Sequence, residues 1–291
     1  MTLSGLHVLL TYQCTFACDH CFVWGSPQQS GTLRLRQIRE ILEQAGDLGT
    51  VGRIYFEGGE PFLYYAVLVR AAAEAADRGF EVGVVTNGYW ATDLEDALTW
   101  LRPLAGLIQG LSVSSDLYHW DEALSQQVQN VQAAADQLSV PLGTISVAQP
   151  GEESASLASL MFRGRAAEKL AHLVPHHPWR TFTACPYEDL RDPGRVHVGP
   201  LGYVQLCQGI ALGNLFHIPL VDLCAAYDPD SHPIVGPLLD GGPAELARRH
   251  GVTPKTAYAD ACHLCYETRR ALRQRYPEVL APDQVYGLAA T

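Results

Sequence analysis

Short apolar runs alternate with longer amphipathic segments over the first half of the chain, and this alternation constrains the fold more than any other feature. Five runs are almost continuously apolar, as expected of strands buried on both faces of a sheet: residues 6–11, 53–58, 81–88, 110–116 and 141–148. Five segments carry apolar residues at helical spacing: residues 35–48, 64–78, 93–104, 119–138 and 155–173. Strands and helices that alternate in this way are typical of βαβ units around a parallel sheet. The sequence therefore predicts the α/β class, with five or six such units forming a partial or full barrel.

The pattern changes after about Val174, where the chain reads Pro175-His176-His177-Pro178-Trp179. We expect a boundary there, with a main unit over residues 1–173 and a smaller unit over residues 174–291. In the smaller unit, residues 196–198 and 203–206 alternate around a Gly199-Pro200-Leu201-Gly202 turn, which predicts a β-hairpin. Two helices are expected to follow, over residues 243–250 and 262–275.

Charge and hydropathy exclude two classes of partner. The formal net charge is −11 and no run is rich in Lys or Arg, so a nucleic-acid partner is not expected. The longest apolar stretches are far shorter than the roughly 20 residues that cross a bilayer, and the first residues lack the features of an export signal. We therefore expect a cytoplasmic protein without a membrane partner. In that reducing compartment, its 8 cysteines indicate metal binding or catalysis before disulfides.

Three of the cysteines, Cys14, Cys18 and Cys21, form a C-x3-C-x2-C group directly after the first predicted strand. Three closely spaced thiolates suit three irons of a [4Fe–4S] cubane, because soft sulfur ligands favour iron, and they leave the fourth iron open. A zinc knuckle is the alternative. Zinc normally closes its site with a fourth local ligand, and His20 is too confined between Cys18 and Cys21 to serve alongside both.

This cysteine spacing, on the loop after the first strand of a predicted βα barrel, resembles the radical S-adenosylmethionine (radical SAM) superfamily. The second predicted strand ends in Gly58, Gly59, Glu60 and Pro61, which resembles the GGEP motif of that family. The resemblance implies that the three cysteines hold a [4Fe–4S] cluster, that its open iron binds S-adenosylmethionine, and that the GGEP residues meet the methionine amino group. It also implies cofactor contacts at later strand ends and in a Gly164-Arg165-Ala166 segment: Asn87, Ser114, Asp116 and Arg165.

A second group of cysteines follows the predicted boundary, at Cys185, Cys207, Cys262 and Cys265. A hairpin bracketed by cysteines and followed by a C-x2-C pair resembles the twitch subdomain, the short relative of the SPASM domain. The resemblance implies a second, auxiliary [4Fe–4S] cluster held by these four residues. A structural zinc site with four cysteines is the alternative. Cys224 is left over and is expected to be a buried apolar thiol.

The resemblance implies a radical SAM oxidoreductase. A reductant such as flavodoxin or ferredoxin would supply the electron that cleaves S-adenosylmethionine to a 5′-deoxyadenosyl radical, which abstracts a hydrogen atom from the substrate. With an auxiliary cluster, the expected outcome is oxidation of a small molecule. A maturase of a ribosomally synthesised peptide is the alternative within the class. A non-catalytic iron–sulfur electron carrier, or a zinc-stabilised binding protein, is the alternative from another class, although such proteins need no S-adenosylmethionine pocket.

Overall fold

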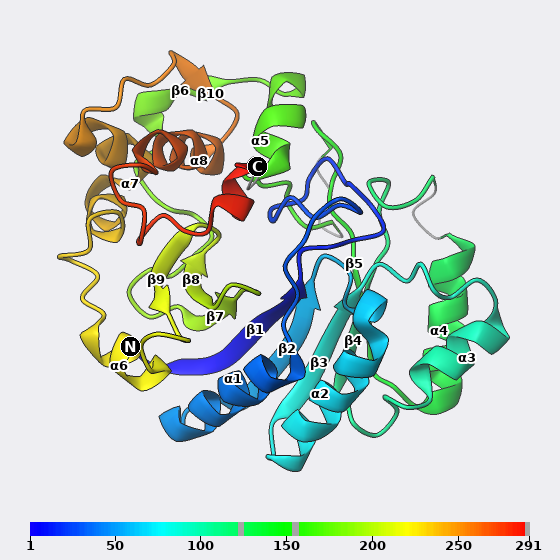
Figure 1. The fold of residues 1–291 in the computed structure, drawn as a ribbon. Helices are drawn as coiled ribbons and strands as arrows, with labels where there is room; N and C mark the ends of the chain where they lie inside the picture. Colours follow the sequence, from blue (N-terminus) through cyan, green and yellow to red (C-terminus); the bar gives the residue numbers. More distant parts are fainter. Residues whose placement is uncertain (122–124, 153–156, 289–291) are drawn as a thin grey trace.

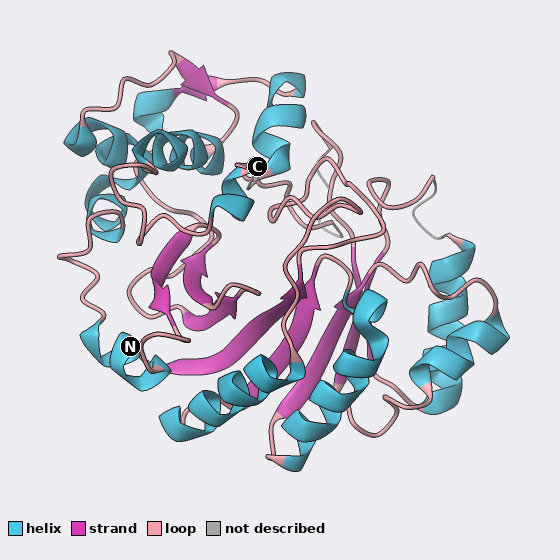
Figure 2. Cartoon of the chain, viewed as in Figure 1, coloured by secondary structure: helices cyan, strands magenta, loops and turns pink. Residues whose placement is uncertain are grey.

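The computed structural model describes residues 1–121, 125–152 and 157–288. Its centre is an eight-stranded sheet in the order β5-β4-β3-β2-β1-β7-β8-β9 (Figures 1 and 2). The strands are β1 (Leu3–Thr11), β2 (Arg53–Gly58), β3 (Glu81–Thr86), β4 (Gly110–Ser114), β5 (Leu142–Ile145), β7 (Gly194–Val198), β8 (Tyr203–Cys207) and β9 (Ile210–Asn214). β1 to β5 and β7 run parallel, whereas β8 and β9 are antiparallel additions. The predicted α/β class is thus confirmed, with a parallel core arranged as a partial barrel.

Eight α-helices accompany the sheet in the described residues. They are α1 (Leu35–Leu48), α2 (Tyr65–Asp77), α3 (Leu94–Leu101), α4 (Gln126–Leu138), α5 (Arg165–Lys169), α6 (Leu220–Ala226), α7 (Val235–His250) and α8 (Ala261–Leu272). Shorter elements are the 3₁₀ turns η1 (Pro61–Tyr64), η2 (Ala171–Leu173), η3 (Trp179–Thr181) and η4 (Asp283–Tyr286), and the two-stranded sheet of β6 (His177–Pro178) and β10 (Ala257–Tyr258). Helices α1 to α4 connect the successive parallel strands and cover one face of the sheet (Figure 1).

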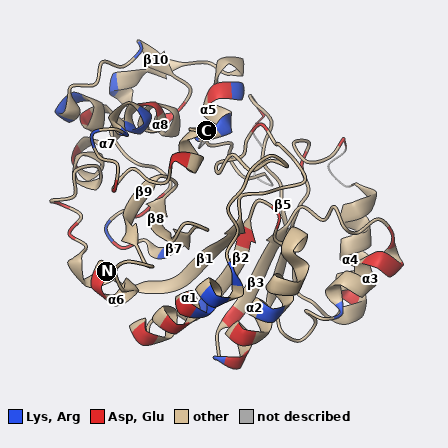
Figure 3. Cartoon of the chain, in the orientation of Figure 1, with Lys and Arg blue, Asp and Glu red and all other residues tan. Residues whose placement is uncertain are grey.

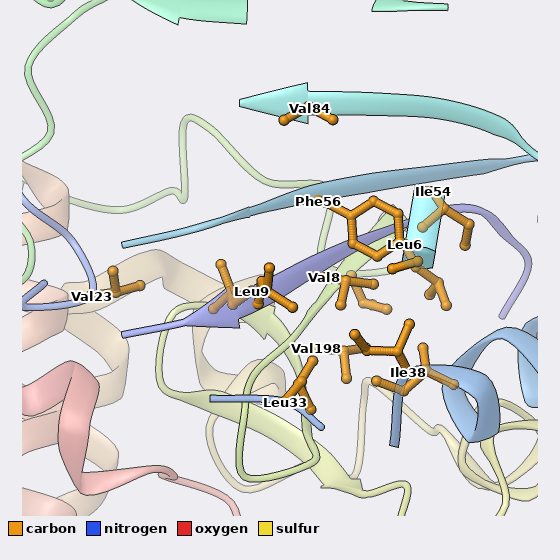
Figure 4. Packing of buried hydrophobic residues seen from close by; sticks show 14 of the residues in the cluster. Leu6, Val8, Leu9, Val23, Leu33, Ile38, Ile54, Phe56, Val84 and Val198 are labelled. Atoms are coloured by element: carbon orange, nitrogen blue, oxygen red, sulfur yellow. The ribbon is translucent and has the colours of Figure 1, made fainter. Parts of the chain in front are cut away.

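Strand β1 lies in the interior because its side chains are apolar on both faces. Leu6, Val8 and Leu9 are fully buried, and they alternate between the two faces of the strand. Figure 4 shows Leu6 and Val8 close to Ile38 of α1, on the helix-covered face. β1 contains no charged residue, whereas Asp and Glu gather on the outer helices (Figure 3). Burial of these side chains removes apolar area from water and so stabilises the fold.

The prediction of a helix over residues 155–173 is wrong for residues 157–164, which are not helical. Residues 155 and 156 lie outside the described residues. Two contacts explain the difference. Ala158 bonds to the backbone of Ser146 and Ala148, so this stretch lies beside the chain that follows β5. Gly164 has a φ of 59°, and a Cβ there would lie 2.6 Å from the Cα of Phe22. This close approach to the cysteine loop excludes a continuous helix.

The helix predicted over residues 119–138 begins later, at Gln126, and residues 122–124 lie outside the described part of the chain. The Ser125 side chain accepts a hydrogen bond from the Val128 amide at 3.3 Å, which caps the helix start. His119 instead bonds to Asp116, as described below.

The predicted hairpin is confirmed as β7 and β8, and β7 also pairs in parallel with β1. Leu6 lies opposite Val196, and Val8 lies opposite Val198. One sheet therefore contains strands from both sides of residue 173, and it shows no break there. The division into units 1–173 and 174–291 stays a prediction. The two predicted C-terminal helices correspond to α8 and to the second half of α7, which kinks at Gly241 and Gly242.

None of the helices in the described ranges is both long and apolar enough to cross a bilayer.

Replacing Leu6 by Ala should lower the free energy of unfolding by about 2–5 kcal/mol, because a fully buried side chain in the central strand leaves a cavity. The matched control is Leu173→Ala, whose side chain is 56% exposed and whose loss should cost less than about 0.5 kcal/mol. Urea denaturation of the two variants measures both values, and equal losses would contradict the central position of β1.

Candidate functional site

The three cysteines of the C-x3-C-x2-C group line one cavity of about 330 Å³ at the end of β1. Two backbone amides point at their sulfurs: Gly25 N–H donates to Cys21 Sγ at 3.2 Å, and Phe16 N–H donates to Cys14 Sγ at 3.5 Å. Burial raises the pKa of the Cys14 thiol to about 11, so this thiol is neutral until a metal displaces its proton. No fourth cysteine lines the cavity in the part of the chain that the structure describes. The set therefore fits a cluster with three thiolate ligands and hydrogen bonds to sulfur.

Arg165 holds the loop that carries these cysteines. Its Nη1 donates to the Cys18 carbonyl at 2.6 Å, and its Nη2 donates to the Gly25 carbonyl at 2.8 Å. The guanidinium also lies over the Trp24 ring, 5.4 Å from the centroid. The terminal nitrogens of Arg165 thus bond to the loop, and the cofactor contact expected for this residue stays a prediction.

Gly58 and Gly59 line the same cavity at the end of β2. The backbone of Gly59 lies so close to the cysteine loop that a Cβ would stand 2.1 Å from the Gln13 carbonyl oxygen. Gly59 N–H donates to the Thr11 carbonyl at 2.7 Å, and Glu60 N–H donates to the Gln13 carbonyl at 2.9 Å. The Gly-Gly pair therefore sets the distance between β2 and the cysteine loop.

Glu60 and Pro61 are buried and are not among the described residues that line the cavity. The Glu60 carboxylate accepts hydrogen bonds from the Phe62 amide, the Thr86 hydroxyl and the Asn87 amide at 2.7 to 3.0 Å. Burial raises the pKa of Glu60 to about 7, although these hydrogen bonds oppose the shift. The carboxylate thereby joins the ends of β2 and β3, and a direct cofactor contact of its side chain stays a prediction.

The remaining predicted cofactor residues come from β3 and β4. Asn87 and Ser114 line the cavity, and Asn87 Nδ2 donates to Thr15 Oγ1 at 3.0 Å and lies 3.6 Å from Cys14 Sγ. Asp116 is 3% exposed and accepts from His119 Nδ1 at 2.7 Å. Burial opposes the ionisation of Asp116, but the contacts with His119, His20 and the Val147 amide together outweigh it and lower the pKa of this carboxyl. Asp116 therefore orients His119, which itself lines the cavity.

The four cysteines of the second group line a separate, smaller pocket, which we call the second cysteine site: Cys185, Cys207, Cys262 and Cys265. Cys207 is the last residue of β8, and Cys262 and Cys265 lie in the first turns of α8. The Asp260 carboxylate caps this helix by accepting a hydrogen bond from the His263 amide at 2.7 Å. Cys224 lies apart from this site, buried on α6. The structure thus groups the four predicted residues and separates the fifth.

Two buried arginines lie at the second cysteine site, and the sequence did not single them out. Arg163 Nη1 donates to Cys207 Sγ at 3.2 Å, and Arg269, which is 2% exposed, lies beside Cys265 in the same pocket. Arg163 also lines the first cavity, so it lies between the two cysteine groups. Its position two residues before Arg165 is the only signal in the sequence that could have found it.

The distances between the cysteine sulfurs can be compared with those that zinc and iron–sulfur sites require. In the described residues, no three cysteine sulfurs lie within 4.8 Å of one another. A tetrahedral zinc with Zn–S bonds of about 2.3 Å needs thiolates about 3.8 Å apart. The thiolates of a cubane each bind a different iron and stand further apart.

The sequence analysis did not predict a third polar cluster, which is formed by His7, Glu57 and His197. Glu57 lines the cavity, and its carboxylate lies 3.0 Å from His7 Nδ1 and 3.3 Å from His197 Nε2. The three residues come from β2, β1 and β7: the pairing of β1 with β2 brings His7 near Glu57, and the pairing of β7 with β1 adds His197.

The N-terminal part of the chain, which carries the first cysteine group, is similar to a known family. Residues 8–118 match the family described as the Radical SAM superfamily. The match covers the cysteine loop and most of the parallel strands from β1 to β4, which is less than half of the chain. That family implies a [4Fe–4S] cluster that works with S-adenosylmethionine, and Cys14, Cys18 and Cys21 fit such a cluster as described above.

Two curated relatives are similar over part of the chain. YydG of Bacillus subtilis strain 168, named as a peptide biosynthesis protein, is 26% identical over 123 residues, which are 42% of this chain and 39% of YydG. The S-adenosylmethionine-dependent nucleotide dehydratase of Fibrobacter sp. strain UWH6 is 28% identical over 116 residues, 38% of this chain and 32% of that protein. The chain therefore spans less than two fifths of the length of either relative.

A solved structure supports the fold. The crystal structure of BtrN in complex with AdoMet and 2-DOIA is similar with a TM-score of 0.52 and 20% sequence identity, covering 77% of this chain and 82% of that one. At this identity the likeness shows the fold alone.

Replacing Gly59 by Ala should reduce S-adenosylmethionine binding strongly, by about tenfold or more, because the added Cβ would displace the Gln13 carbonyl and the cysteine loop. Gly46→Ala is the matched control, since nothing lies within 4 Å of its added Cβ, and it should bind normally. Calorimetric titration of the cluster-loaded proteins with S-adenosylmethionine measures the effect. Unchanged affinity in the Gly59 variant would contradict the close approach.

Proposed function

We propose that this protein is a radical SAM enzyme that cleaves S-adenosylmethionine reductively and uses the resulting radical to oxidise a small molecule. The observation that carries the proposal is the shared cavity: the three cysteine thiols, the Gly58-Gly59 backbone, Asn87 and Ser114 all line it, inside a radical SAM domain. When bound, a reduced cluster of this family supplies one electron that splits S-adenosylmethionine into methionine and a 5′-deoxyadenosyl radical, which abstracts a hydrogen atom from the substrate.

The residues of the chain have distinct parts in this proposal. The Gly58-Gly59 backbone leaves room for the methionine end of S-adenosylmethionine, and Asn87 and Ser114 offer polar contacts along the same wall. Apolar side chains such as Phe22, Leu160 and Met161 line the rest of the cavity and would shield a radical from water. Arg165 keeps the cysteine loop in place from outside the cavity.

We propose that the second cysteine site holds an auxiliary [4Fe–4S] cluster, as in a twitch subdomain. Arg163 and Arg269 support this assignment because a buried guanidinium is costly unless an anion lies beside it. Arg269 bonds to the Gln208 carbonyl and the Tyr286 hydroxyl, both neutral, so the thiolates of Cys265 and its neighbours are its nearest anionic partners among the described residues. Four thiolates around a cluster would supply that negative charge, and the spacing of the thiols favours iron over zinc.

An auxiliary cluster makes oxidation the favoured reaction. A substrate radical in the first cavity would pass an electron toward the second cysteine site, and Arg163 lines both. A reductant such as flavodoxin or ferredoxin is required to start each cycle, and the cytoplasmic location stays a prediction. The name of YydG favours a second candidate function, the modification of a peptide, whereas the fold neighbour BtrN was crystallised with 2-DOIA.

One assay distinguishes a non-catalytic electron carrier or a zinc-stabilised binding protein from the two radical SAM functions. Reconstituted protein with dithionite should release 5′-deoxyadenosine from S-adenosylmethionine, and Cys14→Ala, Cys18→Ala or Cys21→Ala should each abolish that release because the open iron would be lost. Cys224→Ala is the control and should retain it, since this buried thiol lies outside both sites. Absence of 5′-deoxyadenosine from the wild-type protein would leave the carrier as the better function.

Cys262→Ala should spare S-adenosylmethionine cleavage while removing about four irons per chain, because it takes a ligand from the second cysteine site only. Iron analysis beside the 5′-deoxyadenosine assay measures both. Loss of cleavage together with the iron would point to a structural role for this site.

Arg269→Met should also deplete iron from the second cysteine site, because an anionic cluster would lose a buried cation. Arg270→Met is the matched control on the same helix, as its side chain is 40% exposed and pairs with Glu168 instead. Equal iron contents in the two variants would show that the buried charge does not stabilise the cluster.

A further inference from the structure

The cluster of His7, Glu57 and His197 has no part in the S-adenosylmethionine chemistry proposed above, yet it forms part of the cavity wall. His7 and His197 lie opposite each other in the register of β1 and β7, and Glu57 lies further along β2, next to Gly58. Glu57 Oε2 lies 3.0 Å from His7 Nδ1, and Glu57 Oε1 lies 3.3 Å from His197 Nε2. The Glu57 side chain is 13% exposed, and it is the residue of the three that lines the cavity.

Glu57 brings a carboxyl group to the cavity wall. Burial opposes the ionisation of Glu57, but the close contacts with His197 and His7 together outweigh it and hold the pKa of this carboxyl well below its ordinary value. Burial also lowers the pKa of His197, which favours the neutral form of its imidazole.

Apart from its two histidines, this carboxylate has no unengaged Lys or Arg beside it among the described lining residues. Among the described residues of the lining, Glu57 is the carboxylate and Arg163 is the Lys or Arg side chain. Arg163 is already engaged, with Cys207 Sγ at 3.2 Å and Glu188 Oε1 at 3.7 Å. The neighbouring lining is largely apolar, and a low local dielectric strengthens the attraction between a carboxylate and a bound cation.

We propose that Glu57 binds a primary ammonium group of the substrate, so that the small molecule oxidised in the cavity is an amine. The role of this amine in catalysis rests on the function proposed above, but its binding requires no reduced cluster. A compact ammonium fits because each carboxylate oxygen already faces one imidazole, whereas a planar guanidinium would need both oxygens free.

A metal ion is the competing occupant, and the outer contacts of the cluster disfavour it. Histidines that ligate metals almost always donate their second ring nitrogen to a neighbouring acceptor. His197 Nδ1 is buried and has no hydrogen-bond partner among the described residues. His197 therefore lacks the second contact that is typical of a metal ligand, and its Nε2 lies beside the Glu57 carboxylate.

The test uses two probes of equal size, benzylamine and benzyl alcohol, added to the cluster-loaded protein with S-adenosylmethionine and no reductant. Calorimetry or ligand-observed NMR should show benzylamine binding about tenfold tighter than benzyl alcohol. Equal affinities, or failure of benzylamine to bind at millimolar concentration, would overturn the proposal without any variant.

Glu57→Gln should remove the preference for the amine, since it keeps the size of the side chain and deletes the charge. Glu43→Gln is the matched control, because it makes the same charge change at an exposed position of α1 and should keep the preference. Persistence of the preference in Glu57→Gln would overturn the ammonium site. S-adenosylmethionine affinity, measured in the same samples, shows that each variant is folded.

This experiment separates two failures. If benzylamine is preferred but no 5′-deoxyadenosine forms on reduction, the ammonium site stands and the proposed radical chemistry fails. If 5′-deoxyadenosine forms but the amine is not preferred, the ammonium site fails alone.

Discussion

Strand β1 is hydrogen-bonded in parallel to β2 on one side and to β7 on the other, and the candidate site depends on this pairing. At its end the chain enters the cysteine loop, and the end of β2 places Gly59 against the backbone of that loop. On the other side, β7 brings His197 beside His7 and leads through the hairpin to Cys207. One apolar strand, buried on both faces, thereby fixes the positions of both cysteine groups and of Glu57.

Buried arginines are the second organising element. Arg163, Arg165 and Arg269 are each at most 9% exposed, and each contacts a segment that carries cysteines. Arg165 neutralises carbonyl dipoles of the first loop, whereas Arg163 and Arg269 lie beside sulfur at the second cysteine site. Guanidinium groups are costly to bury unless acceptors or anions satisfy them: two backbone carbonyls satisfy Arg165, and Cys207 Sγ and the Glu188 carboxylate lie beside Arg163.

The sequence predicted the local features of this structure well. Strands buried on both faces produce continuous apolar runs, so β1 to β5 were found near their observed positions. The hairpin was predicted by its Gly-Pro turn, and the four cysteines that the resemblance grouped line one pocket. These features depend on residues that are close in sequence or on a motif that a family resemblance supplies.

Features that depend on long-range pairing could not be predicted. The pairing of β7 with β1 leaves no trace in local periodicity, and it adds His197 to the pair formed by His7 and Glu57. The loss of helix over residues 157–164 follows from contacts of Ala158 and Gly164 with distant segments. The direction of the Glu60 side chain could not be predicted either. It points into the protein toward Thr86 and Asn87, whereas the neighbouring Gly59 lines the cavity.

The most direct test of the account is metal analysis with electron paramagnetic resonance of the anaerobically reconstituted, dithionite-reduced protein, with and without S-adenosylmethionine. The account predicts about eight irons and little zinc per chain, and a cluster signal that changes when S-adenosylmethionine is added, because one iron has an open position. Zinc as the bound metal, with no signal that responds to S-adenosylmethionine, would contradict it.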